Sequence, residues 1–185
     1  MKARYVHNWQ MTPDHARQKQ RELAAMVVTE NQVKNVHLVA GVDISAPDAR
    51  GLARAAVVVL RYPGMELQET KEVEQEPGFP YVPGLLSFRE APLILAACEK
   101  LNSEPDLVLV DGQGIAHPRR LGLASHLGVL WDKPTIGCAK SRLCGTHKAL
   151  PEDQGAYTEL TDNGEVIGAV LRTRRSVKPL YISIG

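Results

Sequence analysis

The chain has 185 residues, of which 44% are apolar and 23% are charged, and its formal net charge at pH 7 is +1. This length and composition fit one domain, residues 1–185, with a substantial core, and they disfavour two independent domains. The balance of 22 basic against 21 acidic side chains excludes a general positive field, so binding of nucleic acid would depend on local placement of Arg and Lys.

The cysteines and the N-terminus indicate a cellular compartment. Cys98, Cys138 and Cys144 are odd in number and include no C-x-x-C pair, so neither a disulfide framework nor structural zinc is favoured. The N-terminus has no basic flank followed by an apolar segment, and no stretch approaches 18 uninterrupted apolar residues. We expect a soluble, cytoplasmic monomer without a membrane partner.

The first half of the chain predicts a helix and three strands. Pro13 opens a helical pattern that runs to Val28, with Thr12 as its N-cap. Apolar and β-branched runs then predict strands over residues 36–45, 52–62 and 67–73. Pro63 and Gly64 form the hairpin between the last two strands.

The second half alternates helices and strands. A stretch rich in Pro and Gly at residues 76–84 precedes a helix that begins at Leu85 or Ser87 and ends at Leu101. The remaining elements are a strand at 107–110, a helix around 121–131, a short strand at 135–138 and a strand-rich tail at 166–172 and 180–184. Three antiparallel strands continued by alternating helices and strands predict a mixed α/β fold.

The segment that begins at Leu107 carries the strongest chemical signal. Asp111 falls where a buried strand emerges at the edge of the sheet. Two glycines that let backbone approach a ligand, and three cationic side chains beside them, follow in the loop: Gly112, Gly114, His117, Arg119 and Arg120. The pattern suggests metal-assisted phosphate chemistry, whereas an ordinary turn is the alternative for a lone Asp-Gly pair.

Two further acids lie on core elements. Asp43 interrupts an apolar strand, where burial of a lone charge would be costly, and Glu90 lies in the first turns of the helix after the Pro-rich loop. The first and fourth strands of such a sheet are neighbours, so Asp43 and Asp111 are expected side by side. Carboxylates about 4 Å apart repel by roughly 4 kcal/mol, which calls for a proton or a cation, and oxygen ligands favour Mg²⁺ or Mn²⁺. The alternative is that each acid is a separately satisfied cap or surface residue.

Five sequence motifs follow one another in a characteristic order between residues 39 and 145. They are Val39–Ser45 (VAGVDIS), Phe79–Glu90 (FPYVPGLLSFRE), Asp111–Arg120 (DGQGIAHPRR), Ala124–His126 (ASH) and Pro134–Gly145 (PTIGCAKSRLCG). In these motifs the chain resembles the endonuclease V family, the deoxyinosine-specific nucleases of DNA repair. The resemblance implies a ribonuclease H-like fold, in agreement with the element order. It also implies Mg²⁺-dependent hydrolysis of the phosphodiester one nucleotide beyond the lesion on its 3′ side, leaving 3′-hydroxyl and 5′-phosphate ends.

The resemblance assigns catalytic roles residue by residue. Asp43, Glu90 and Asp111 match the family's acids that hold Mg²⁺, for which Mn²⁺ can substitute. Lys140 matches the active-site lysine, which would steady the scissile phosphate as a point charge. His117 matches a histidine beside the active site, and its alternative role is that of a loop histidine capping local backbone.

The resemblance also assigns nucleic-acid contacts. Tyr81 matches the wedge that family members push into the duplex, and a tyrosine that covers the edge of the core is the alternative. The other residues expected to contact DNA are Pro80, Val82, Pro83, Arg89 and Arg119. Hypoxanthine presents an O6 acceptor and an N1–H donor, which backbone groups can read. The residues expected to build that pocket are Gly84, Leu86, Gly112 and Gly137.

The sequence departs from the family pattern after its last strand. Family members continue with a Gly-His, or a residue of like role, and helical sequence, whereas this chain stops at Gly185. The histidines that cannot be assigned that role are His7, His15, His37, His126 and His147. Two hypotheses therefore stand: a competent nuclease for deoxyinosine in double- or single-stranded DNA, or for inosine in RNA, and a module that binds inosine-containing nucleic acid but cleaves it weakly or not at all.

Overall fold

Nine strands form a single sheet, and the computed structural model describes all of residues 1–185. The strand order is β3-β2-β1-β4-β5-β9-β8-β7-β6. The strands are β1 (Leu38–Ile44), β2 (Ala53–Arg61), β3 (Glu66–Gln75), β4 (Leu107–Val110), β5 (Thr135–Ala139), β6 (Thr146–His147), β7 (Tyr157–Asp162), β8 (Glu165–Leu171) and β9 (Leu180–Ile184). The helices are α1 (Pro13–Ala24), α2 (Leu86–Glu99) and α3 (Leu123–Trp131).

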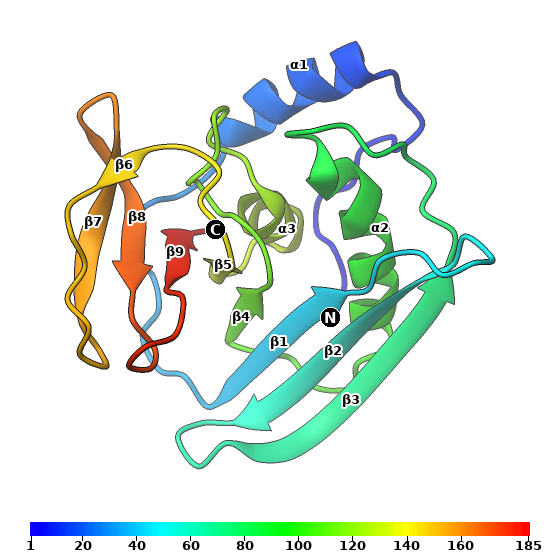
Figure 1. Cartoon of the computed structure of the whole chain (residues 1–185). Coiled ribbons are helices and arrows are strands. Elements are labelled where there is room, and N and C mark those ends of the chain that lie inside the picture. Colours follow the sequence, from blue (N-terminus) through cyan, green and yellow to red (C-terminus); the bar gives the residue numbers. More distant parts are fainter.

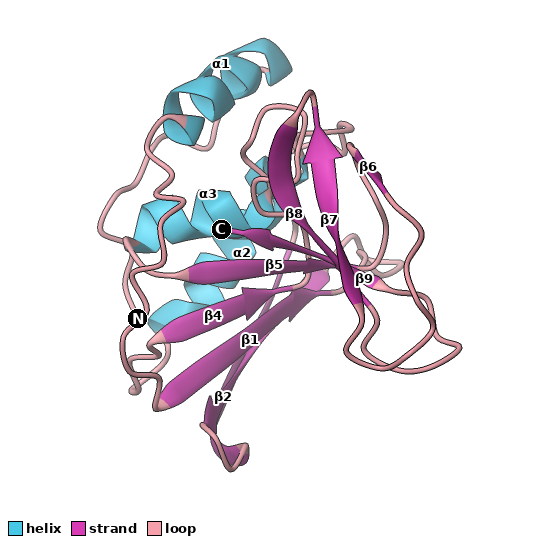
Figure 2. Ribbon diagram, turned by 90° about the vertical axis from the view of Figure 1, so that its left-hand side faces the viewer, coloured by secondary structure: helices cyan, strands magenta, loops and turns pink.

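The sheet has the mixed pairing that the sequence predicted. β2 is antiparallel to both of its neighbours, β1 and β3, and β4 and β5 continue the sheet parallel to β1. The prediction of an α/β, ribonuclease H-like sheet with flanking helices is therefore confirmed. Figure 2 shows β1, β4 and β5 side by side, with β7 and β8 turned steeply away from their direction.

Two of the helices, α2 and α3, cover one face of this sheet, and α1 contacts α3. α2 contacts β1, β2 and β3, α3 contacts β4 and β5, and the two helices lie side by side (Figure 1). The alternation of buried and less buried residues along β2 puts Ala55, Val57 and Val59 into the core beneath α2. None of the three helices is long and apolar enough to span a bilayer.

The larger differences from the expected elements are the end of α1 and two additional strands. α1 ends at Ala24 rather than Val28, because the β-branched pair Val27-Val28 and Thr29 favour extended backbone over further helical turns. Strands β6 and β7 were not predicted. β7 and β8 are joined by Asn163-Gly164, both with positive φ (54° and 83°), the pattern of a two-residue hairpin turn. That dipeptide was the available signal for β7.

The register of the parallel strands places the candidate site. Val42 of β1 is paired with Val110 of β4, and Val110 is paired with Gly137 of β5. The residues that follow these strands therefore emerge at the same edge of the sheet. Asp43 and Asp111 lie side by side at this edge, as predicted, and Lys140 follows the end of β5.

Candidate active site

A cavity of about 440 Å³ opens at this edge of the sheet. Its walls come from the carboxyl ends of β1, β4 and β5, from the loop before α2 and from the first turn of α2. This volume is in the range of sites that bind a small molecule or one base. The predicted residues that line it are Asp43, Tyr81, Val82, Pro83, Gly84, Leu86, Glu90, Asp111, Gly112, His117 and Lys140.

The three predicted metal-binding acids face this one cavity from three elements. Asp43 is exposed, and its Oδ1 accepts a hydrogen bond from the amide of Ile44 at 2.7 Å. Glu90 and Asp111 are half-buried. Burial, together with the negative charges of Asp43 and Asp111, raises the pKa of Glu90 to about 7. The negative charges of Asp43 and Asp111 thus oppose the ionisation of Glu90.

Lys140 provides the positive charge at this group of acids. Its ammonium group donates a hydrogen bond to Oδ2 of Asp111. This bond, and the charges of Asp111 and Asp43, raise the pKa of Lys140. The Lys140 side chain is 74% exposed, so its ammonium group is accessible to a further anion as well as to Asp111.

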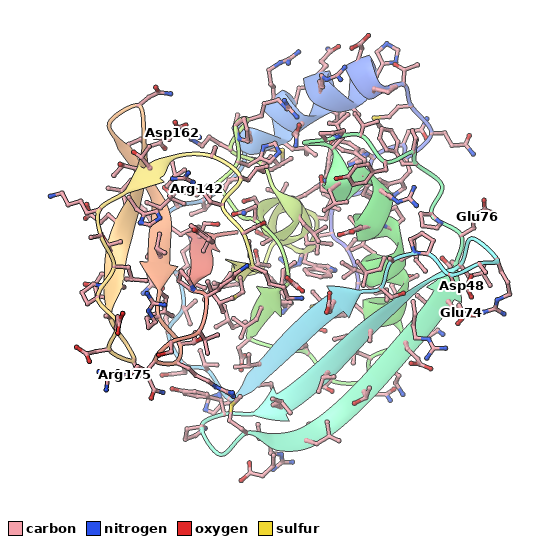
Figure 3. The ribbon with its side chains drawn as sticks, in the orientation of Figure 1. Asp48, Glu74, Glu76, Arg142, Asp162 and Arg175 are labelled. Carbon is pink, nitrogen blue, oxygen red and sulfur yellow. The ribbon has the colours of Figure 1, made fainter.

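Two acids elsewhere in the molecule share an arginine, unlike two acids of the site. Arg50 forms ion pairs with Asp48 at 2.8 Å and with Glu74 at 2.7 Å, and Figure 3 shows these two acids close together near the end of β3. Asp43 and Glu90 form no ion pair with any cation of the chain. A local excess of negative charge therefore remains at the cavity.

The donor set suits a hard divalent cation. Three carboxylates that line one cavity offer the oxygen ligands that such an ion takes, and a cation there would favour the ionised form of Glu90. In this structure no three His, Cys, Asp or Glu side chains are grouped closely enough to hold a metal. The residues fit a metal by their chemistry and their common cavity, and the side chains would have to draw together around it.

A loop between β3 and α2 presents Tyr81 at the mouth of the cavity. The tyrosine is 72% exposed, whereas Phe79 and Leu85 on either side of it are buried against Phe88 and Ala16. The tyrosine thus projects from a loop whose two ends are anchored in the core. The structure does not support the alternative that Tyr81 covers the edge of the core.

Hydrogen bonds hold both ends of this loop. Arg89 donates to the carbonyl oxygen of Phe79 at 2.7 Å. The carbonyl oxygen of Gly84 accepts from Arg119 at 2.7 Å, from Gln20 at 3.0 Å and from His117 at 3.2 Å. Arg89 and Arg119, which were predicted to contact DNA, therefore direct hydrogen bonds inward to the loop.

His117 makes backbone contacts through both ring nitrogens. Nε2–H donates to Gly84, and Nδ1 accepts from the amide of Arg119 at 3.1 Å, so the ring is neutral with its proton on Nε2. Burial and the nearby Arg119 lower the pKa of His117 to about 4. The contacts match the second of the two roles considered for it, a loop histidine that binds local backbone.

The four predicted pocket residues do not all reach the cavity. Gly84, Leu86 and Gly112 line it, and Gly84 has a positive φ of 76° that favours glycine. Gly137 does not line the cavity, and its prediction as a pocket residue is corrected. It is buried under the loop after β4, where an added Cβ would lie 2.4 Å from the amide nitrogen of Gly114. Its absent side chain allows that loop to pack on β5.

Comparison with known proteins decides the family. The family model described as Endonuclease V matches residues 21–185. The chain is 54% identical to Endonuclease V of Dehalococcoides mccartyi over 185 residues, which cover all of this chain and 83% of that protein. The chain belongs to the endonuclease V family.

Solved structures of endonuclease V proteins have the same fold. The crystal structure from Bacillus subtilis is 35% identical and superposes with a TM-score of 0.94, covering 100% of this chain and 81% of that one. The Ciona intestinalis endonuclease V is 30% identical with a TM-score of 0.79, covering 93% of this chain and 82% of that one. The Ciona protein was solved in complex with a 24mer DNA containing an inosine followed by a ribo-adenosine.

Membership of the endonuclease V family establishes the reaction class. This chain is a nuclease acting on phosphodiester bonds, in a family of metal-dependent nucleases.

Several residues of the site were not predicted from the sequence. Gln20 of α1 is fully buried and lines the cavity, and it reaches both the loop before α2 and the loop after β4. It lies four residues after Ala16 and three before Leu23, the other two buried positions of α1. A polar residue in the apolar stripe of a helix was the available signal for it. The other unpredicted lining residues are Ile44, Ser87, Gln113, Leu121, Gly122, Leu123, Ala139, Ser141 and Leu143.

Proposed function

We propose that this protein is a Mg²⁺-dependent repair endonuclease that recognises deoxyinosine in DNA. In this proposal it hydrolyses the second phosphodiester bond on the 3′ side of the lesion and leaves 3′-hydroxyl and 5′-phosphate ends. The observation that carries the proposal is the convergence of three acids and a lysine in one cavity, with an exposed tyrosine at its mouth.

Asp43, Glu90 and Asp111 are the proposed metal ligands, and Mn²⁺ can replace Mg²⁺ because both take oxygen donors. The elevated pKa of Glu90, caused by burial and by the other two acids, supports a shared cation at this place. A divalent ion bound here would lower the pKa of an attacking water and neutralise charge on the leaving oxygen.

Lys140 and His117 serve the reaction in different ways. Lys140 would leave Asp111 and bind the scissile phosphate, because its ammonium group is exposed and lies beside the acids. His117 is buried and uses both ring nitrogens on backbone, so it holds Gly84 in place and does not transfer a proton to or from the substrate.

Tyr81 and the cavity account for lesion recognition. An anchored loop presents the tyrosine to the duplex with little ordering entropy, since Pro80 and Pro83 restrict the backbone beside it. Extrusion of the damaged base costs a few kcal/mol, and less at a mispair. The flipped base would enter the cavity beside Gly84 and Gly112, where backbone groups can approach it closely.

Inosine in RNA is the second candidate substrate. The Ciona relative was solved with an inosine followed by a ribo-adenosine, so a ribose at that position is bound in a member of the family. The weakly cleaving binding module is a third reading. All three acids are present here, which favours catalysis over that reading.

We further propose that residues 1–185 act as one monomeric domain in the cytoplasm. All nine strands belong to one sheet, which supports a single domain. The odd number of cysteines and the lack of a C-x-x-C pair support a reducing compartment.

A cleavage assay tests the proposed function. The protein is incubated with labelled duplexes that contain one deoxyinosine, one riboinosine or neither, with Mg²⁺ or with chelator, and the products are mapped on a sequencing gel. Mg²⁺-dependent nicking at the second phosphodiester 3′ of deoxyinosine supports the proposal. Selective cleavage of the riboinosine strand would favour the ribonuclease reading, and retained binding in a gel shift without cleavage would favour the binding module.

A further inference from the structure

Gln20 connects three segments of the chain from the middle of α1. Its side-chain amide donates to the carbonyl oxygens of Gly84 at 3.0 Å and Leu121 at 2.7 Å. Its side-chain oxygen accepts a hydrogen bond from Nε of Arg119. The side chain is fully buried, and every polar atom in it has a partner.

We propose that Gln20 is a positioning residue for lesion recognition, which acts by fixing the loop that carries Tyr81 (residues 79–85, the lesion loop). This proposal rests on the proposed function and deepens it. Burial of a side-chain amide costs desolvation free energy unless its hydrogen bonds are made. A Leu at this position would avoid that cost and would extend the apolar stripe of α1. The bonds that offset this cost lead to the lesion loop and to the loop after β4.

The peptide between Gly84 and Leu85 is the group that Gln20 fixes. Its carbonyl oxygen accepts three hydrogen bonds, from Gln20, Arg119 and His117. Its N–H, at Leu85, donates to the carbonyl oxygen of Val82 at 2.9 Å. Both ends of one peptide plane are therefore held, three residues after Tyr81 and next to the cavity.

Gln20 also orients the guanidinium group of Arg119. The arginine donates Nε–H to Gln20 and Nη2–H to Gly84, so one plane is fixed by two acceptors. The guanidinium packs against Gly84, where an added Cβ would lie 2.7 Å from Nη2. Loss of Gln20 therefore weakens two of the three bonds to the Gly84 carbonyl at once.

Substitutions of Gln20 separate positioning from catalysis. Gln20→Met keeps the length of the side chain and removes all three hydrogen bonds. Gln20→Glu keeps an acceptor for Arg119 and removes both donated bonds. For each variant we expect a Kd about tenfold higher for a duplex with one deoxyinosine in chelator, which corresponds to the loss of about one net hydrogen bond. The Kd for undamaged duplex and the single-turnover cleavage rate at saturating protein stay within about twofold of wild type.

A matched control and a double variant distinguish this role from general destabilisation. Thr135 is buried outside the cavity, and its hydroxyl donates a hydrogen bond to the carbonyl oxygen of Ala124. Thr135→Val removes this bond and should leave both Kd values unchanged. If Gln20→Met does not fold, Arg119→Met tests the same contact with the Gly84 carbonyl oxygen from a partly exposed position in a loop. The double variant should bind deoxyinosine no more weakly than Arg119→Met, because the two residues act through one contact.

Three results would overturn the assignment of Gln20. The first is an unchanged preference for deoxyinosine in folded Gln20 variants and in Arg119→Met. The second is a loss of affinity for deoxyinosine in Thr135→Val that equals the loss in the Gln20 variants. The third is a fall in the saturated cleavage rate that matches the fall in affinity. If wild-type protein itself shows no preference for the deoxyinosine duplex, the proposed function fails and this assignment fails with it. A wild-type preference that the variants retain rejects the assignment alone.

Discussion

The amide of Asp111 donates a hydrogen bond to the carbonyl oxygen of Val42 at 3.1 Å. This bond continues the parallel ladder of β1 and β4 by one step, and it places Asp111 beside Asp43, the residue after Val42. Backbone pairing thus fixes the spacing of two acids, while Glu90 approaches from a helix. The following predictions test what this arrangement does.

Removal of Asp43 should separate cleavage from binding. We expect Asp43→Ala to lower the cleavage rate by at least about a thousandfold, because a metal ligand supplies several kcal/mol of transition-state stabilisation. Affinity for the deoxyinosine duplex in chelator should stay within about threefold, since Asp43 is exposed and its carboxylate accepts a hydrogen bond only from its neighbour Ile44. Asp153→Ala, at an exposed acid outside the cavity, is the control. Loss of binding by folded Asp43→Ala would show that the acid does more than hold metal.

Removal of the Tyr81 ring should weaken lesion recognition and spare the fold. The side chain is 72% exposed, so Tyr81→Ala should change the free energy of unfolding by less than about 0.5 kcal/mol. Its affinity for the deoxyinosine duplex should fall about tenfold, which gel shifts would measure. Tyr157→Ala on β7 removes a tyrosine that is 70% exposed and lies outside the cavity, and it should bind as wild type does. Equal effects of the two substitutions would argue against a wedge.

The buried histidines should make the fold sensitive to acid. His126 lies between Ser87, at 3.0 Å, and His7, at 2.8 Å, and burial together with His7 lowers the pKa of His126 to about 3. A lowered folded-state pKa gives stability that is present above the unfolded value of 6.5 and is lost as the pH falls toward 3. The slope from this residue is about 1.4 kcal/mol per pH unit. Urea unfolding between pH 7 and 5 should show a shallower dependence for His126→Gln than for wild type, and equal slopes would contradict this origin.

Glu90 should couple stability to divalent cations, with the opposite sign. Its folded-state pKa is raised to about 7 by burial and by Asp43 and Asp111. The associated stability is present below the unfolded value of 4.5 and is lost as the pH rises through 7. In chelator at pH 8, Glu90→Gln should therefore be more stable than wild type by roughly 1–3 kcal/mol. Mg²⁺ should raise the Tm of wild type and leave that of Glu90→Gln unchanged, and an equal Mg²⁺ shift in both proteins would place the cation elsewhere.

Much of the site was predictable because it depends on local sequence and strand order. Asp43 lies near the end of one apolar strand and Asp111 follows another, and the order of strands makes these two strands neighbours. The exposed position of Tyr81 was implied by the resemblance to the endonuclease V family, because a Pro-rich loop alone is equally compatible with a tyrosine that covers the core.

The parts that were not predicted depend on contacts between distant segments. Arg119 and Arg89 carry charge that is typical of phosphate contacts, yet their hydrogen bonds go to backbone of the lesion loop. Gly137 allows the loop after β4 to pack closely on β5, a contact that the sequence of β5 alone does not indicate. Gln20 is separated by 64 residues from Gly84, so no local pattern announces the contact.

Diffraction from crystals grown with Mn²⁺ and a deoxyinosine oligonucleotide would test the central claim most directly, because the anomalous signal locates the metal without assumption. We predict a peak coordinated by carboxylate oxygens of Asp43, Glu90 and Asp111, with the three side chains drawn together and Lys140 moved from Asp111 to phosphate. A peak bound by other residues, or none at these acids in crystals whose protein nicks the oligonucleotide, would contradict the account.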